Sequence, residues 1–335
     1  MSVLWIEGFD SFGTSGAAVG LQSKYTGNVF ANMDVDSPRF TGYSLRLRGG
    51  GGQNGYITTP NLGNVATICT GFSYYPRTLL NAYIVELREA DNSTSGMNIR
   101  MQTDGKISLY RNNTLIATTA ISVLSAATWH HIELKVTIAN SGTYELRVNG
   151  VNVLSGSADT REGSNDYCNR VRLVGPDAIV GQAPSFDDWW IADAFLGDRK
   201  VMTIFPDADG DSSDFTPSTG GDNYAMVDDN GPDDDSTYVQ SDTPGDSDLY
   251  THGNVSGASS IIAIQANIVA RKTDVTDFDM NLTVKSGSTE DDGAAVTVSS
   301  TDFANYTRIL ETDPDTGVAW TQSGLNSAQI GPKVG

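Results

Sequence analysis

The sequence predicts an all-β chain made of two antiparallel β-sandwiches, with the larger one first. Many segments alternate apolar and polar residues with a period of two, which is typical of half-buried strands. No segment shows a convincing amphipathic helical period, and the 35 glycines favour turns instead. Residues 1–200 contain 18 acidic and 16 basic residues, whereas residues 201–335 contain 23 and 5. Because such a change in charge indicates a boundary, the two domains are expected at 1–198 and 199–335.

The strands predicted in the first domain follow one another with short turns between them. One strand is expected to direct Ile132 and Leu134 toward the core and the polar residues between them outward. Similar strands are expected at 83–88, with the odd-numbered residues toward the core, and at 97–102. Asn-Gly at 149–150 is the preferred two-residue hairpin turn because both residues tolerate a positive φ.

The stretch F-D-D-W-W-I-A-D-A-F at 186–195 is predicted to be the last strand of the first sandwich. Side chains alternate along a strand, so Asp187 and Asp188 are expected on opposite faces, as are Trp189 and Trp190. One tryptophan is then expected in the core. The other is expected to be available for ligand binding, by stacking on a sugar, or for a contact between subunits.

The second domain is predicted to begin with a strongly acidic stretch. Residues 201–250 contain 13 Asp and no Glu, Lys or Arg, yet aromatic residues such as Phe215, Tyr224 and Tyr238 recur in it. A disordered linker normally lacks so many aromatic residues, so long loops that join short strands are expected here. Strands are predicted to resume after residue 259 and to form the smaller C-terminal β-sandwich.

Four motifs stand in a fixed order in the first domain: D-G-K-I-S-L-Y-R-N at 104–112, T-W-H-H-I-E-L-K-V at 128–136, G-T-Y-E-L-R-V-N-G at 142–150 and F-D-D-W-W-I-A-D at 186–193. Together they resemble the concanavalin A-like lectin/glucanase superfamily in its laminin-G-like form. The resemblance covers about residues 1–195 and implies a jelly-roll sandwich. It does not select a function, because this fold hosts lectins, hydrolases and structural modules alike.

Four further motifs follow: G-D-R-K-V at 197–201, P-D-A-D-G-D at 206–211, D-D-N-G-P-D-D-D-S-T-Y-V at 228–239 and E-T-D-P-D-T-G-V-A-W-T at 311–321. This combination resembles a region of tailed-phage virion proteins that follows a laminin-G-like domain. The resemblance implies a structural tail, fibre-associated or head-decoration protein of the virion, assembled in the host cytoplasm. The implied partners are other virion proteins, further copies of the chain and a host-surface glycan. A carbohydrate-binding lectin module is the alternative.

Enzymatic activity is not expected, and no catalytic residue is predicted. Glucanases of the resembled fold use two carboxylates, carried on one strand as E-x-D-x-E or E-x-D-x-x-E. The chain has eight Glu and none lies in such a run; Glu86 and Glu89 have the wrong spacing and no Asp between them. His130 and His131 lack evident partners for a nucleophilic or zinc site, so a structural role is favoured for both.

Calcium is the cofactor that the acidic residues suggest. Asp207, Asp209 and Asp211 resemble the start of an EF-hand loop, but Ser stands where that loop needs Gly at position 6 and Glu at position 12. These carboxylates are interpreted either as ligands of Ca²⁺ in a loop or as a solvated acidic surface. Asp187 and Asp188 likewise suit a calcium site at the sandwich rim or a structural role.

Other partner classes are disfavoured by charge and hydropathy. A net charge of −20 opposes binding to nucleic acid. No run approaches the roughly 20 apolar residues of a membrane helix, and the first residues lack the basic segment of a secretory signal. Neither membrane insertion nor secretion is therefore expected. Cys69 and Cys168 are predicted to be buried thiols, with a single bridge between them as the alternative.

Overall fold

The computed structural model describes residues 2–13, 18–29, 33–89 and 95–335. The chain divides into two compact units, Met1–Met202 and Thr203–Gly335. Strands dominate both units and the described helices are short, so the predicted all-β class is confirmed. No described helix has the length and apolar character needed to span a membrane.

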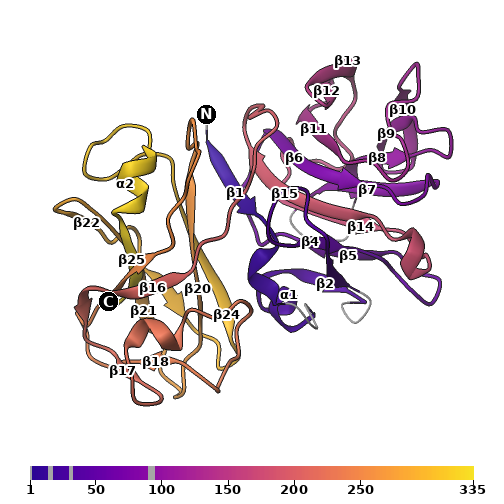
Figure 1. Ribbon diagram of the computed structural model, residues 1–335. Coiled ribbons are helices and arrows are strands. Elements are labelled where there is room, and N and C mark those ends of the chain that lie inside the picture. Colours follow the sequence, from indigo (N-terminus) through magenta and orange to yellow (C-terminus); the bar gives the residue numbers. More distant parts are fainter. Residues whose placement is uncertain (1, 14–17, 30–32, 90–94) are drawn as a thin grey trace. The chain divides into compact units, whose positions relative to one another are not determined.

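The N-terminal unit is a sandwich of two antiparallel sheets (Figure 1). Among the described residues, the eight-stranded sheet has the order β13 (Val151–Ala158), β12 (Gly142–Val148), β11 (His130–Thr137), β6 (Thr67–Tyr75), β15 (Ser185–Ala192), β4 (Ser44–Arg46) and β3 (Asp34–Asp36), with β1 (Val3–Glu7) also paired to β15. The seven-stranded sheet has the order β10 (Thr114–Thr118), β9 (Ile107–Arg111), β8 (Ser95–Met101), β7 (Ala82–Arg88), β14 (Arg170–Gly175), β5 (Gly55–Thr58) and β2 (Thr26–Asn28).

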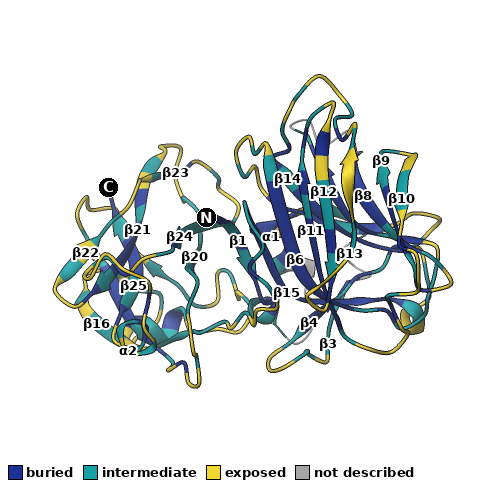
Figure 2. Cartoon of the chain, turned by 90° about the horizontal axis from the view of Figure 1, so that it is seen from above, coloured by how far each residue is buried: buried dark blue, intermediate teal, exposed yellow. Residues whose placement is uncertain are grey.

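The core of this sandwich lies between the two sheets. Ile132 and Leu134 of β11 share one buried cluster with Met97 and Ile99 of β8, as their alternating patterns predict. Figure 2 shows the inner strands β6 and β15 mostly in the colour of buried residues, whereas the edge strand β13 is largely exposed. Burial of each such side chain contributes about 1.5–3 kcal/mol to stability.

Strand β7 departs from the predicted alternation because it contains a β-bulge. Its pairing with β8 shifts register between Tyr83 and Val85. Ile84 and Val85 are therefore both in the core, and Tyr83 is only partly buried. Tyr83 and Ile84 thus exchange the faces that a regular strand would give them, a consequence of the extra residue that a bulge inserts.

Both free cysteines of the N-terminal unit are buried. Cys69 lies on β6, and Cys168 lies just before β14, where it pairs with Val65 across an isolated bridge. Burial raises the pKa of both thiols, to about 12 for Cys168. Two buried thiols, the first of the two predicted alternatives, are therefore confirmed.

The C-terminal unit is a smaller sandwich. Among the described residues its main sheet has the order β16 (Pro206–Ser213), β19 (Asp248–His252), β25 (Gln329–Val334), β21 (Phe278–Ser286) and β22 (Thr289–Asp291), with β23 (Val296–Val298) also on β21. The pair β20 (Ile264–Ala270) and β24 (Ala304–Leu310) packs on it through Ala266, Met280, Leu282 and Val298. A short pair, β17 (Thr216–Pro217) and β18 (Val239–Gln240), lies within the acidic stretch.

The helices of the chain were not predicted. Among the described residues they are α1 (Ala18–Lys24) and α2 (Gln322–Asn326), with 3₁₀ turns at Asp10–Phe12, Val180–Gln182 and Asn223–Met226. Each spans two turns or fewer, which is too short to show a helical period in the sequence.

Candidate functional site

The two predicted aspartates lie at a β-bulge in β15. Asp188 has a φ of +50°, and the pairing with β6 shifts register between Asp187 and Trp190. The backbone N–H of Arg39 donates to Oδ2 of Asp187 at 2.8 Å, and the hydroxyl of Ser73 donates to Oδ2 of Asp188 at 3.1 Å. Arg39 also forms an ion pair with Asp188 at 3.7 Å. The predicted opposite orientation is therefore wrong, because the bulge places both Phe186 and Trp189 in the core and leaves the two aspartates between them outside it.

The segment that follows β15, residues 193–202, forms a strap over the outer face of the eight-stranded sheet. The backbone N–H of Gly197 donates to Oε1 of Glu133 at 2.8 Å. The backbone N–H of Val201 donates to Oδ1 of Asp188 at 2.8 Å. The carboxyl groups on this face therefore hold the strap in place.

The electrostatics of the bulge follow from its burial beneath the strap. Asp198 of the strap forms a two-bond ion pair with the guanidinium of Arg39. Burial and the charge of Asp188 raise the pKa of Asp187 to about 8, and burial raises the pKa of Asp188 to about 6. Both residues are at most 4% exposed, so they lie beneath the strap and not at an open rim. Calcium binding by this pair stays a prediction.

The predicted sugar-stacking role of Trp189 or Trp190 is wrong, because neither ring is exposed. Trp189 is fully buried in the core, and its Nε1 donates to Oγ1 of Thr70 at 3.0 Å. Trp190 is 2% exposed and lies flat over Gly71, where a Cβ would come within 2.2 Å of its Cζ2. Stacking on a sugar needs an open ring face, which both side chains lack.

The three predicted calcium ligands of the acidic stretch lie on strand β16. Each carboxylate has its own partner: Asp207 accepts from the hydroxyl of Thr251 at 2.7 Å, Asp209 from the backbone N–H of Tyr224 at 2.7 Å, and Asp211 pairs with Nζ of Lys285 at 2.7 Å. Among the described residues, no three side chains of Asp, Glu, His or Cys gather in a way that suits a metal ion. The structure does not bring these carboxylates together into one site.

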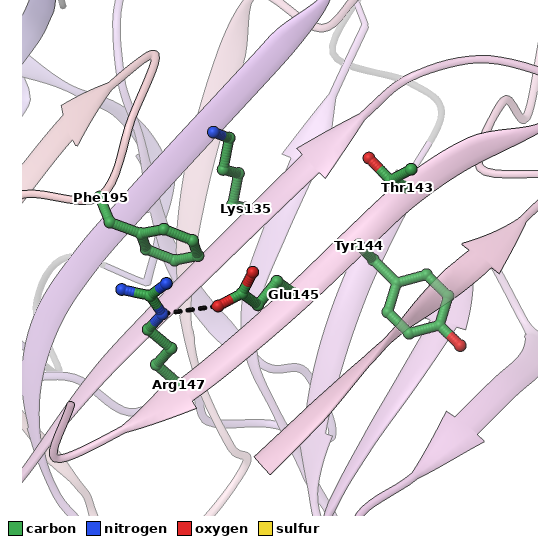
Figure 3. Close-up of a pocket in the computed structure, with 6 residues that line it drawn as sticks. All are labelled: Lys135, Thr143, Tyr144, Glu145, Arg147 and Phe195. Atoms are coloured by element: carbon green, nitrogen blue, oxygen red, sulfur yellow. Dashed lines mark hydrogen bonds and ion pairs between the residues drawn. The ribbon is translucent and has the colours of Figure 1, made fainter. Parts of the chain in front are cut away.

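A hollow of about 340 Å³ opens on the outer face of the eight-stranded sheet. Figure 3 shows Lys135, Glu145 and Arg147 beside Phe195 of the strap, with Tyr144 pointing away from them. The guanidinium of Arg147 stacks on the Phe195 ring at 3.7 Å and donates to Glu145 at 2.6 Å. The Phe195 ring and the Arg147 cation of this hollow therefore contact each other, and Glu145 pairs with the same arginine.

The seven-stranded sheet carries a denser set of polar and aromatic side chains. Its register places residues of five adjacent strands in one row: Thr58 of β5, Arg172 of β14, Glu86 of β7, Asn98 of β8 and Tyr110 of β9. The neighbouring core residues on these strands point inward, so this row lies on the outer face. The strands themselves are adjacent in Figure 1. We call this row the arginine–tyrosine face, together with its neighbours Tyr56, Tyr83, Arg88, Arg100 and Arg170.

Contacts within one half of this face centre on Glu86. Its Oε2 accepts from Nη1 of Arg88 at 2.7 Å and lies 3.5 Å from Nη1 of Arg172. Arg172 also donates from Nε to the hydroxyl of Thr58 at 2.9 Å, and its guanidinium lies 3.6 Å from the ring centre of Tyr56. These contacts fix the orientation of both arginines.

The other half of the face is a stack of two tyrosines around one arginine. The guanidinium of Arg100 lies 4.1 Å from the ring centre of Tyr83 and 3.9 Å from that of Tyr110. Its Nε donates to Oδ1 of Asn98 at 2.9 Å, and its Nη2 donates to the carbonyl of Asn112 at 2.6 Å. Tyr83, Arg100 and Tyr110 are each half-buried, so part of every member of the stack remains open to solvent.

The sequence interpretation missed this face because its members are far apart in the chain and each looks like an ordinary outward residue of a strand. One signal was available. Arg170 and Arg172 alternate with the core residues Val171 and Leu173, which places two cations on one side of a strand in a strongly acidic protein.

Comparison with known proteins identifies no family. No family model and no curated protein matches the chain. Among solved structures, the carbohydrate-binding module CBM66 from Bacillus subtilis is 11% identical, with a TM-score of 0.34 over 50% of this chain and 94% of that one. The alginate lyase Aly36B is 10% identical, with a TM-score of 0.40 over 56% of this chain and 95% of that one. An endo-β-1,4-glucuronan lyase from Trichoderma reesei is 13% identical, with a TM-score of 0.37 over 49% of this chain and 88% of that one.

The two lyases correct one prediction. The chain was expected not to be an enzyme because it lacks the paired carboxylates of a glucanase. Polysaccharide lyases stand among the structures to which this chain is similar, and a lyase does not cleave its substrate by hydrolysis. The missing carboxylate pair therefore disfavours only the glucanase mechanism. It does not support the prediction that the chain is not an enzyme.

Proposed function

We propose that the N-terminal unit binds glycans through the arginine–tyrosine face. The observation that carries this proposal is the half-exposed stack of Tyr83, Arg100 and Tyr110. Tyrosine offers an apolar ring and a polar hydroxyl, which match the C–H and O–H groups of a sugar. Guanidinium and amide groups beside it supply donors in fixed directions, as ligand sites generally do.

We further propose that the chain is a structural component of a tailed-phage virion, assembled in the host cytoplasm with other virion proteins and further copies of itself. The motifs at 197–201, 206–211, 228–239 and 311–321 support this role through their resemblance to phage proteins. A glycan-binding face on such a component would meet polysaccharide on the host surface. The high negative charge of the C-terminal unit suits a soluble exterior position.

Replacement of Tyr83 with alanine should weaken glycan binding about tenfold, because it removes one ring of the stack and frees Arg100 to rotate. A glycan array identifies the bound polysaccharides, and calorimetry with the full chain measures their affinities. Polymer chain length is compared before and after incubation, so that cleavage is not mistaken for weak binding.

Tyr75→Ala is the matched control for this variant. Tyr75 is also half-buried and lies beside an arginine, Arg77, but it belongs to the eight-stranded sheet. Equal losses in the two variants would contradict the assignment of binding to the arginine–tyrosine face.

The virion role is tested by mass spectrometry of purified particles. We expect the protein at a fixed copy number relative to the major capsid protein, as a symmetric assembly requires. Its absence from particles that are otherwise complete would remove this part of the proposal and leave the glycan-binding part standing.

A further inference from the structure

The arginine–tyrosine face concentrates positive charge in a protein of the opposite sign. As defined, it contains four arginines, Arg88, Arg100, Arg170 and Arg172, and one glutamate, Glu86, whereas the whole chain has a net charge of −20. Arg88 and Arg170 stand directly opposite each other in the register of β7 and β14. Like charges in that position repel each other, and Glu86 of the same face pairs with Arg88 at 2.7 Å.

Burial adds to this effect in the centre of the face. Arg172 is 8% exposed and Arg88 is 5% exposed. Burial, followed by the charge of Arg88, lowers the pKa of Arg172. Charges that are partly removed from water interact more strongly with an incoming ligand than charges at the open surface do.

Arg100 is the member of the face that is best prepared to meet an anion. The two tyrosine ring centres lie 4.1 and 3.9 Å from its guanidinium. Asn98 accepts from Nε, and Asn112 and Asn113 accept from Nη2. These contacts leave the planar group fixed at a half-exposed position. Nη1, whose two hydrogens take no part in these bonds, is left to donate to a carboxylate in a charge-assisted hydrogen bond.

We propose that the arginine–tyrosine face selects acidic glycans, in which uronate carboxylates bind the arginines while the sugar rings lie against the tyrosines. This inference rests on the proposed glycan-binding function and names its ligand class. Because the protein carries a net charge of −20, attraction of a polyanion requires a local cluster of cations such as this face. Binding should therefore weaken as salt is raised.

The test uses the full chain with alginate, polygalacturonate and hyaluronate, each compared with its carboxyl-reduced form. Reduction keeps the backbone of the polymer and removes its charge. We expect at least one acidic polymer to bind about tenfold more tightly than its reduced form. Arg100→Gln should abolish most of that difference, and Arg170→Gln, at a half-buried position, should reduce it.

Arg147→Gln is the matched control, since Arg147 also stacks on an aromatic ring and pairs with a carboxylate, but on the other sheet. Equal affinity for acidic and reduced polymers would overturn the acid selectivity and leave glycan binding intact. If Arg147→Gln loses as much affinity for the acidic polymers as Arg100→Gln and Arg170→Gln do, the assignment of binding to the arginine–tyrosine face would be overturned. Binding to none of these polymers and to no glycan of the array would overturn the proposed function itself.

Discussion

Replacement of Trp189 with alanine should lower the free energy of unfolding of the N-terminal unit by about 3–5 kcal/mol. Trp189 is among the largest fully buried side chains of the sandwich. Its ring stacks with Tyr25 and Phe9, with ring centres 6.0 and 6.4 Å away, and its Nε1 donates to Thr70. The truncation would leave a cavity in the core. It would also remove the hydrogen bond from Nε1 of Trp189 to the Thr70 hydroxyl, so both packing and hydrogen bonding are lost.

The measurement is chemical denaturation followed by the fluorescence of the remaining tryptophans. Trp129→Ala is the control, because Trp129 is half-buried and its ring contacts Tyr75 at 5.3 Å. This variant should lose about 1 kcal/mol. A loss below about 1 kcal/mol in Trp189→Ala as well would contradict the burial of its ring in the core.

This expectation changes how a binding experiment on Trp189 is to be interpreted. From sequence, the paired tryptophans of β15 were candidates for stacking on a sugar, and an alanine variant without binding would have supported that role. With the ring buried in the core, the same loss of binding would report unfolding. Tyr83 and Arg100 are better positions for mutation because they are half-buried on an outer face.

Regular alternation in the sequence predicted the core well wherever the strands are regular. Ile132 and Leu134 of β11 and Met97 and Ile99 of β8 all lie in the buried cluster. Prediction was wrong at Tyr83 and again at Asp188, where β-bulges insert one extra residue and break the alternation of faces. No residue type marks these bulges, since their position depends on pairing with a strand distant in the chain.

The candidate site was less predictable than the fold for a related reason. The row from Thr58 to Arg172 joins residues 114 positions apart, and only the order of strands in the sheet makes them neighbours. Local motifs direct attention to clusters that are contiguous in sequence, such as Asp207, Asp209 and Asp211. In the structure those three carboxylates lie on one strand, and each takes a separate partner elsewhere in the C-terminal unit.

His131→Gln should make the N-terminal unit less sensitive to acid than the wild type. His131 is fully buried, and burial lowers its pKa from 6.5 to about 4. The carboxylate of Asp198, 3.6 Å from Nδ1, raises the pKa, whereas the charge of Arg39 lowers it further. The unfolded state therefore binds a proton between these two pKa values while the folded state does not.

The sign of the effect follows from that difference. The contribution of the neutral histidine to the free energy of unfolding is fully present above pH 6.5 and is lost as the pH falls toward 4. Between about pH 7 and about pH 5 the wild type should lose about 2 kcal/mol through this group. Asp187 acts in the opposite direction, because its raised pKa of about 8 favours the folded state as the pH falls. Comparison with a variant isolates the histidine, since Asp187 is present in both proteins.

Urea denaturation at the two pH values measures this loss, with the lower one kept above the isoelectric point of about 4.3, where association would interfere. The His131→Gln variant should lose about 2 kcal/mol less than the wild type over this interval. His252→Gln, in the C-terminal unit, should leave the acid sensitivity of the N-terminal unit unchanged. Equal acid sensitivity in the wild type and in His131→Gln would show that this imidazole is not held neutral beneath the strap.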